Sequence, residues 1–218
     1  LLGAVDAAIG GKTAVNLEAK NLVGAFRHPT RVVIDADVLD ALPESLRREG
    51  AAEALKAGLV GDPNLVALYE REGLQADPVE VVRRAVAVKA AIVGRDFREQ
   101  GERAYLNYGH TIGHAVEAAT GVSHGSAVAV GMAAAGRAAA LVVGFPEEDR
   151  QREVIARLGL PVAAGEAERR SVLGLLGLDK KRDAAGLRMV LLERVGRPRL
   201  EHVAAATVEA ALAAVGIS

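Results

Sequence analysis

The 218-residue sequence contains no cysteine, and aromatic residues make up only 3% of it. Without cysteine the chain can form neither disulfides nor thiolate metal sites, so cysteine usage does not constrain its redox compartment. Half of the residues are hydrophobic, and most of these are alanine, valine or leucine. A composition so poor in aromatic side chains favours closely packed helices over a β-sandwich, in a chain long enough to bury a substantial core.

An excess of charge of one sign is also absent, because the formal net charge is −1. The chain therefore has no general tendency to bind nucleic acid or acidic membranes. The apolar stretch 127–143 is short for a membrane span and carries Arg137, so we expect a buried helix. No charged-then-apolar signal peptide opens the sequence. We expect a cytoplasmic protein, and, since it begins Leu-Leu-Gly rather than with Met, a fragment of a longer one.

Lysine is scarce, since only six of the 27 basic residues are lysine and the rest are arginine. Lysine is a compact point charge whose pKa can shift, so some sites cannot exchange it for arginine. Chance retention at the solvated surface is a fair explanation for any single lysine, but it does not explain all six together. Two of them stand in glycine-containing segments, GGKT and KNLVG, where an anion or cofactor contact competes with an ordinary glycine turn. The six are Lys12, Lys20, Lys56, Lys89, Lys180 and Lys181.

The hydrophobic periodicity predicts a single, mainly α domain with a few short strands. The first ~35 residues are glycine-rich and loop-like, and they lead into a short strand at Val32–Ile34. Asp77 and Pro78 are a typical helix start. We expect helices at about 43–61, 77–95, 107–120, 126–143, 147–158, 167–177 and 206–215, and strands at 187–192 and 200–203 around Gly196.

Three of the five histidines lie within the run NYGHTIGHAVEAATGVSH at 107–124. His110 and His114 are four residues apart, which places them on one face of a helix. His124 follows the turn signal Gly121-Val122-Ser123, so the chain can fold back and bring a third imidazole to the same space. A catalytic zinc site needs three protein ligands and one open position. The alternative is a hydrogen-bonded pair of core histidines.

Glu53 lies among alanines in EGAAEALKAG, which suggests that its carboxylate is buried. A buried carboxylate must be paired or must coordinate a metal, and with two imidazoles it would complete a His₂Glu zinc site. The alternative is a surface ion pair with Lys56.

The segment from Lys89 to Asn107 brings a cation, a carboxylate, a guanidinium and an amide just upstream of the histidines. Such a set suits a polyhydroxylated anionic substrate, because Arg103 can bind a carboxylate or phosphate through two hydrogen bonds. Charges between Asp96 and Arg103 can equally form a solvated loop. Asp6 is either a partner for a lysine or a substrate hydroxyl, or a turn-capping residue.

Taken in order, seven segments resemble the 3-dehydroquinate synthase family of sugar-phosphate cyclases across nearly the whole chain. These are VDAAIGGKTAVN, KNLVGAF, VIDADVLDALP, EGAAEALKAGLV, ERAYLNYGHTIGHAVE, HGSAVAVGM and LDKK. The resemblance implies a helical metal- and substrate-binding domain over 1–218. Residues 1–40 would be an arm continuing from an N-terminal Rossmann-like NAD domain that the chain lacks.

The resemblance also implies a role for each matching residue. The zinc (or cobalt) ligands would be Glu53, His110 and His124. Catalytic groups would be Glu99, His114 and Lys56, and NAD would contact Lys20, Val38, Leu39, Asp40 and Ala41. The substrate would be bound by Asp6, Lys12, Asn21, Lys56, Lys89, Arg103, Asn107, Lys180 and Lys181.

The activity that the resemblance implies is conversion of 3-deoxy-arabino-heptulosonate 7-phosphate to 3-dehydroquinate and phosphate, by a homodimer. Departures from the family pattern include Ala41 in place of threonine and Ser126 in place of the glutamate after His-Gly. A related sugar-phosphate cyclase, a metal-dependent polyol dehydrogenase and a non-catalytic helical fragment are the alternatives. Retention of Asn107 and His114 favours the dehydroquinate activity.

Overall fold

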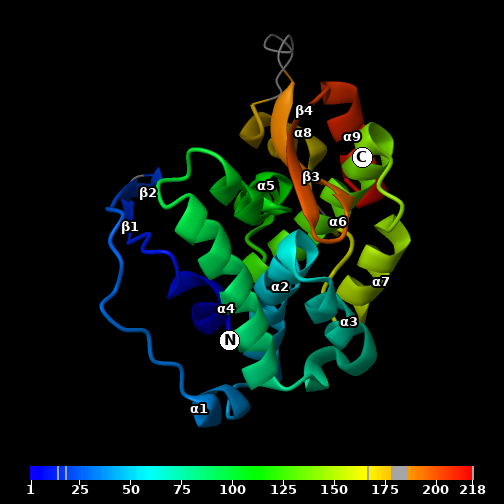
Figure 1. Cartoon of the computed structure of the whole chain (residues 1–218). Helices are drawn as coiled ribbons and strands as arrows, with labels where there is room; N and C mark the ends of the chain where they lie inside the picture. The colour runs from blue at the N-terminus through cyan, green and yellow to red at the C-terminus, as the bar shows by residue number, and fades with distance from the viewer. Residues whose placement is uncertain (14, 18, 166, 178–185, 218) are drawn as a thin grey trace.

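The computed structural model describes residues 1–13, 15–17, 19–165, 167–177 and 186–217. Helix α2 (Glu44–Gly61) lies at the centre, with α4 (Pro78–Arg95) and α6 (His124–Val143) packed against it (Figure 1). The mainly helical fold is therefore confirmed. The other helices are α1 (Ala36–Asp40), α3 (Pro63–Glu72), α5 (His110–Thr120), α7 (Glu148–Arg157), α8 (Arg169–Leu175) and α9 (Ala205–Ala214), with the π-helical turn η1 (Gly3–Ala7) and the 3₁₀ turns η2 (Gly73–Gln75) and η3 (Glu102–Asn107).

Local capping explains where two central helices begin. The carboxylate of Asp77 accepts a hydrogen bond from the backbone N–H of Val79 at 3.0 Å, and Pro78 is the first helical residue of α4, as predicted. Asp62 caps α3 in the same way. The predicted helix over 43–61 agrees with α2, but no helix was predicted over 63–72, so α3 was missed.

Two antiparallel pairs make up the described strands. The hairpin of β3 (Leu187–Arg194) and β4 (Arg197–Val203) turns at Gly196, with φ +81°, and confirms the two strands predicted around this glycine. β1 (Val15–Leu17) pairs with β2 (Ala19–Val23), so the N-terminal arm is less loop-like than predicted. The predicted strand at Val32–Ile34 is wrong, because this segment pairs with no described strand and Val33 is 80% exposed.

Two helices supply most of the core. Every residue of α2 from Gly50 to Val60 is buried. By length and composition alone α6 could cross a membrane, but 67% of its most apolar window is buried inside this fold. The apolar stretch 127–143 is therefore a core helix, as predicted. These two helices also carry the chemistry described next.

Candidate metal and substrate site

Glycines let α5 and α6 pack unusually close together. A Cβ added to Gly131 would lie 1.9 Å from the carbonyl oxygen of Gly109, and one on Gly113 would lie 2.9 Å from that of Ala127. No larger residue fits at either contact. The close packing brings the imidazoles of His110 and His124 together, with ring centroids 5.5 Å apart.

Glu53 of α2 meets these two rings from the other side. Its Oε1 lies 3.2 Å from Nε2 of His110 and 3.3 Å from Nε2 of His124. This oxygen is fully buried and accepts no hydrogen bond. A tetrahedral zinc ion with bonds of about 2.0 to 2.2 Å separates its ligand atoms by about 3.4 Å. The three atoms therefore fit the donor set of a divalent metal ion.

Hydrogen-bond acceptors face the opposite nitrogen of each ring. Nδ1 of His110 lies 3.2 Å from the carbonyl oxygen of Tyr108, and Nδ1 of His124 lies 3.2 Å from Oε2 of Glu117. If Nδ1 carries the proton, each Nε2 keeps its lone pair directed at the site. Such outer partners fix the orientation of metal-binding histidines.

A buried charge network extends from Glu53. Its second oxygen forms an ion pair with Lys56, and Nζ of Lys56 lies 3.8 Å from Oδ1 of Asp6. Asp6 in turn accepts a hydrogen bond from Lys89 at 2.7 Å. The Glu53–Lys56 pair thus exists, but the alternative of a surface pair is wrong, because their side chains are only 1% and 3% exposed.

Burial and charge act differently on the pKa values of these groups. Burial raises the pKa of Glu53, but the charge of Lys56 and the contacts with His110 and His124 outweigh it, so this pKa lies well below its usual value. Burial lowers the pKa of Lys56, but the charges of Glu53 and Asp6 outweigh this effect, so the pKa lies above its usual value. For Lys89 burial dominates and lowers the pKa. Lys56 is therefore a fixed cation, whereas Lys89 releases its proton more readily than an exposed lysine.

Glu99 is the centre of a second polar cluster. It forms an ion pair with Lys12 and accepts a hydrogen bond from the Asn107 amide at 2.9 Å. Burial raises the pKa of Glu99, but these two contacts outweigh it and lower the pKa. Its φ of +59° is unique among the described residues other than glycine. The carboxylate is therefore held ionised beside Lys12 and Asn107, and its role as a proton acceptor stays a prediction.

Arg103 is buried beneath the turn that carries Lys12. Its guanidinium donates hydrogen bonds to the carbonyl oxygens of Gly10 at 2.7 Å and Phe97 at 2.5 Å, and it lies 5.5 Å from the ring centre of Phe26. In the part of the chain that the structure describes, no carboxylate forms an ion pair with it. Arg103 therefore shapes the Lys12 turn, and its contact with a substrate anion stays a prediction.

The remaining predicted site residues lie in several places. The ring of His114 is centred 5.0 Å from that of His110, so this acid–base candidate adjoins the metal ligands. Ligand atoms of His114, Glu117 and His124 lie within 4.8 Å of one another, so these three side chains are an alternative set that could hold a metal ion. Lys20 and Asn21 lie on β2, Val38, Leu39 and Asp40 on α1, and Ala41 at its end, while Lys180 and Lys181 are outside the described residues.

Glu117 and Tyr108 were not among the predicted site residues, although both face the metal-binding histidines. The spacing of Glu117, three residues after His114 on the same helix, was a usable signal. Nothing in the sequence marked the Tyr108 carbonyl, because any residue supplies one.

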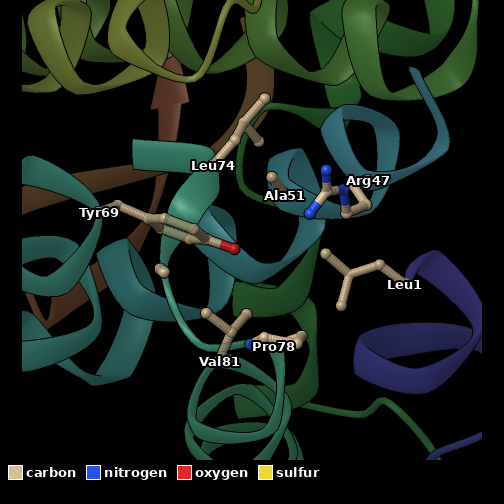
Figure 2. Close-up of a pocket in the computed structure, with 8 residues that line it drawn as sticks. Leu1, Arg47, Ala51, Tyr69, Leu74, Pro78 and Val81 are labelled. Atoms are coloured by element: carbon tan, nitrogen blue, oxygen red, sulfur yellow. The ribbon is translucent and has the colours of Figure 1, made fainter. Parts of the chain in front are cut away.

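A separate cavity lies away from these clusters, between the starts of α2 and α4 and the end of α3. Its volume is about 20 Å³, and the hydroxyl of Tyr69 points toward Arg47 and Leu1 across it (Figure 2). This space holds one water-sized molecule. A sugar-sized substrate does not fit there, whereas a cavity of about 310 Å³ lies against Lys12.

Two family profiles together match residues 1–182. The profile described as 3-dehydroquinate synthase C-terminal matches residues 50–182, and the profile described as 3-dehydroquinate synthase N-terminal matches residues 1–49. The chain is 43% identical over 205 residues to a 3-dehydroquinate synthase of Methylacidiphilum infernorum, covering 91% of this chain and 57% of the relative. It is 42% identical over 225 residues to one of Corynebacterium jeikeium, covering 98% and 61%.

Solved structures agree with this assignment. A 2-epi-5-epi-valiolone synthase from Streptomyces hygroscopicus subsp. jinggangensis, with NAD⁺ and Zn²⁺ bound, matches with a TM-score of 0.86 at 30% identity over 98% of this chain and 63% of its own. A 2-deoxy-scyllo-inosose synthase complexed with carbaglucose-6-phosphate, NAD⁺ and Co²⁺ matches with a TM-score of 0.84 at 28% identity, over 97% and 64%. The chain thus spans about three fifths of the relatives it matches, and it belongs to the 3-dehydroquinate synthase family.

Proposed function

We propose that the chain is the metal- and substrate-binding part of a 3-dehydroquinate synthase. The enzyme would convert 3-deoxy-arabino-heptulosonate 7-phosphate to 3-dehydroquinate and inorganic phosphate. The observation that carries the proposal is the convergence of Glu53, His110 and His124 beside two buried lysines. In a family of NAD- and metal-dependent cyclases, this arrangement supplies both a metal site and cations for a phosphorylated acid.

Each cluster would have a distinct task. Glu53, His110 and His124 would hold a divalent metal, which when bound polarises a substrate hydroxyl as a Lewis acid. Lys56 keeps its charge and would attract substrate oxygens, while Lys89, with its lowered pKa, would move a proton at Nζ. Glu99 would accept a proton at Oε2 or Oε1, and His114 would serve beside the metal ligands.

The cations that face phosphate must act throughout its departure. Lys12 is 46% exposed and stands on a glycine turn, where it can meet an anion without losing its pair with Glu99. Arg103 keeps this turn in place from below. Fixed cations that need no rearrangement stabilise developing charge most effectively. Asn21, Lys180 and Lys181 complete the proposed substrate contacts.

NAD would be bound chiefly by residues outside this chain, with Lys20 and 38–41 forming one edge of its site. The whole protein would be a cytoplasmic homodimer. Calorimetry with NAD tests the placement of the cofactor, since hydride transfer requires a firmly oriented nicotinamide. Tight NAD binding by residues 1–218 alone would contradict it.

Phosphate release tests the activity. The complete enzyme, supplied with NAD and Zn²⁺, should release phosphate from 3-deoxy-arabino-heptulosonate 7-phosphate and should not oxidise glycerol, which separates it from a polyol dehydrogenase. A hexose 6-phosphate is the control for a related cyclase, the class to which the structural neighbours belong. Preference for the hexose phosphate would show that the enzyme is a related cyclase with a different substrate.

A further inference from the structure

The helix that carries His124 begins without a capping side chain of its own. His124 is the first residue of α6, and the preceding N-cap residue, Ser123, makes no capping hydrogen bond. The N–H groups of a first helical turn have no partner within the helix. A local capping box would place glutamate or glutamine three residues after the cap, but Ser126 stands there.

The missing carboxylate comes instead from α2. Oε2 of Glu49 accepts a hydrogen bond from the backbone N–H of Gly125 at 2.7 Å, and Oε1 accepts one from the Ser123 hydroxyl at 2.5 Å. The Ser123 and Ser126 hydroxyls are themselves 2.9 Å apart. The Glu49 side chain thus binds both residues that flank His124, although Glu49 and Gly125 are 76 residues apart in sequence.

The same helix presents the metal-binding carboxylate. Glu49 and Glu53 are four residues apart on α2, so they lie one turn apart on the same face. The backbones also meet here, because a Cβ added to Gly125 would lie 2.7 Å from the carbonyl oxygen of Glu49. The contact therefore joins the two elements that carry Glu53 and His124 immediately beside the metal site.

We infer that Glu49 is a positioning residue, whose carboxylate holds the start of α6 against α2 and so sets the 3.3 Å separation of Glu53 Oε1 and His124 Nε2. The inference rests on the proposed metal site. It distinguishes His124 from His110, because His110 belongs to α5, which Glu49 does not contact by any described hydrogen bond. Loss of the Glu49 contact at the start of α6 should therefore also displace His124 at the metal site.

Metal binding by the purified chain tests this directly, without turnover. Zn²⁺ affinity is measured by competition with a chelator, and Co²⁺ substitution reports ligand geometry through its visible absorption. Glu49→Ala should weaken Zn²⁺ binding by about 10- to 100-fold and change the Co²⁺ spectrum. Glu49→Gln, which keeps one acceptor oxygen, should fall between. The matched control is Glu44→Gln, since Glu44 pairs only with Arg48 of its own helix among the described residues.

A second variant separates positioning from simple capping. Ser126→Glu added to Glu49→Ala creates a local capping box, so the thermal stability of the metal-free chain should recover while Zn²⁺ affinity stays low. Recovery of both would show that Glu49 only caps α6 and would overturn the inference, as would wild-type Zn²⁺ affinity in Glu49→Ala. If Glu49→Ala does not fold, wild-type affinity in Glu49→Gln has the same meaning. A wild-type chain that binds no Zn²⁺ would overturn the metal site itself, and with it the inference.

Discussion

Lys89 donates two hydrogen bonds to Asp6, one to its carbonyl oxygen at 2.5 Å and one to Oδ1 at 2.7 Å, across 83 residues of sequence. The contact fixes η1 against α4. It uses the ability of a single ammonium group to direct donors at two acceptors that are close together. A planar guanidinium has a different reach and donor geometry. The contact therefore explains why lysine occupies this position in an arginine-rich chain.

Lys89→Arg in the complete enzyme should lower kcat/KM at least ~10-fold, which corresponds to roughly 1.4 kcal/mol. The charge is kept, but the larger group cannot occupy the buried position beside Asp6, and a guanidinium does not release its proton. Steady-state kinetics measure the effect. Arg83→Lys on the exposed face of α4 is the control and should change nothing. Near-normal kinetics in Lys89→Arg would return Lys89 to a purely structural role.

The chain should bind one divalent metal ion through Glu53, His110 and His124. His124→Ala removes one of the three ligands, so elemental analysis after dialysis should show most of the metal lost. His202→Ala changes an exposed histidine on β4 and should retain it. Full occupancy in His124→Ala would mean that this histidine is not a ligand.

Glu117→Gln should weaken Zn²⁺ binding by about 10-fold, because the amide keeps the shape of the side chain but loses the charge that faces Nδ1 of His124. Chelator competition measures the change. The variant should fold normally, as judged by its circular dichroism spectrum. Glu80→Gln, on the surface of α4, is the control. Equal Zn²⁺ affinity in both variants would show that Glu117 does not support His124.

Two buried tyrosines should respond oppositely to loss of their hydroxyl groups. Tyr108 donates a hydrogen bond to Gln151 at 2.6 Å, so Tyr108→Phe leaves a buried amide oxygen unpaired and should cost about 1 to 3 kcal/mol. The Tyr69 hydroxyl is buried and makes no described hydrogen bond (Figure 2). Tyr69→Phe should therefore leave the free energy of unfolding unchanged or raise it. Urea denaturation measures the free energy of unfolding of both variants. A larger loss of stability in Tyr69→Phe than in Tyr108→Phe would contradict the assignment of the hydrogen bond to Tyr108.

The same tyrosines predict a loss of stability at alkaline pH. Burial raises the pKa of Tyr69 and of Tyr108 well above the usual value of 10.0. Above pH ~10 the unfolded chain loses these protons while the folded chain keeps them, so the free energy of unfolding falls as pH rises. Denaturation at pH 9 to 11 should show a shallower fall in the Tyr69→Phe, Tyr108→Phe double variant. If the free energy of unfolding falls equally steeply with pH in the double variant and the wild type, the two tyrosines are not the cause.

Local signals made much of the fold predictable. Asp77 and Pro78 mark a helix start because a cap needs only neighbouring residues, and the alanine-rich surroundings of Glu53 indicated its burial. The Glu49–Gly125 and Tyr108–Gln151 contacts were not predictable, since they join residues 76 and 43 positions apart. The error at Val32–Ile34 has the same cause: a β-rich segment becomes a strand only if tertiary structure supplies a partner.

The enclosure of α2 has a consequence for how the protein matures. Helix α2 is buried from Gly50 to Val60, and Oε1 of Glu53 meets His110 and His124 only when α5 and α6 have docked against it. Most helical stability in proteins comes from tertiary packing, so α2 depends on that docking. The three ligands therefore come together only in the assembled core. Metal uptake is a step that follows assembly of the core, and a nascent or partly unfolded chain offers the ion no high-affinity site.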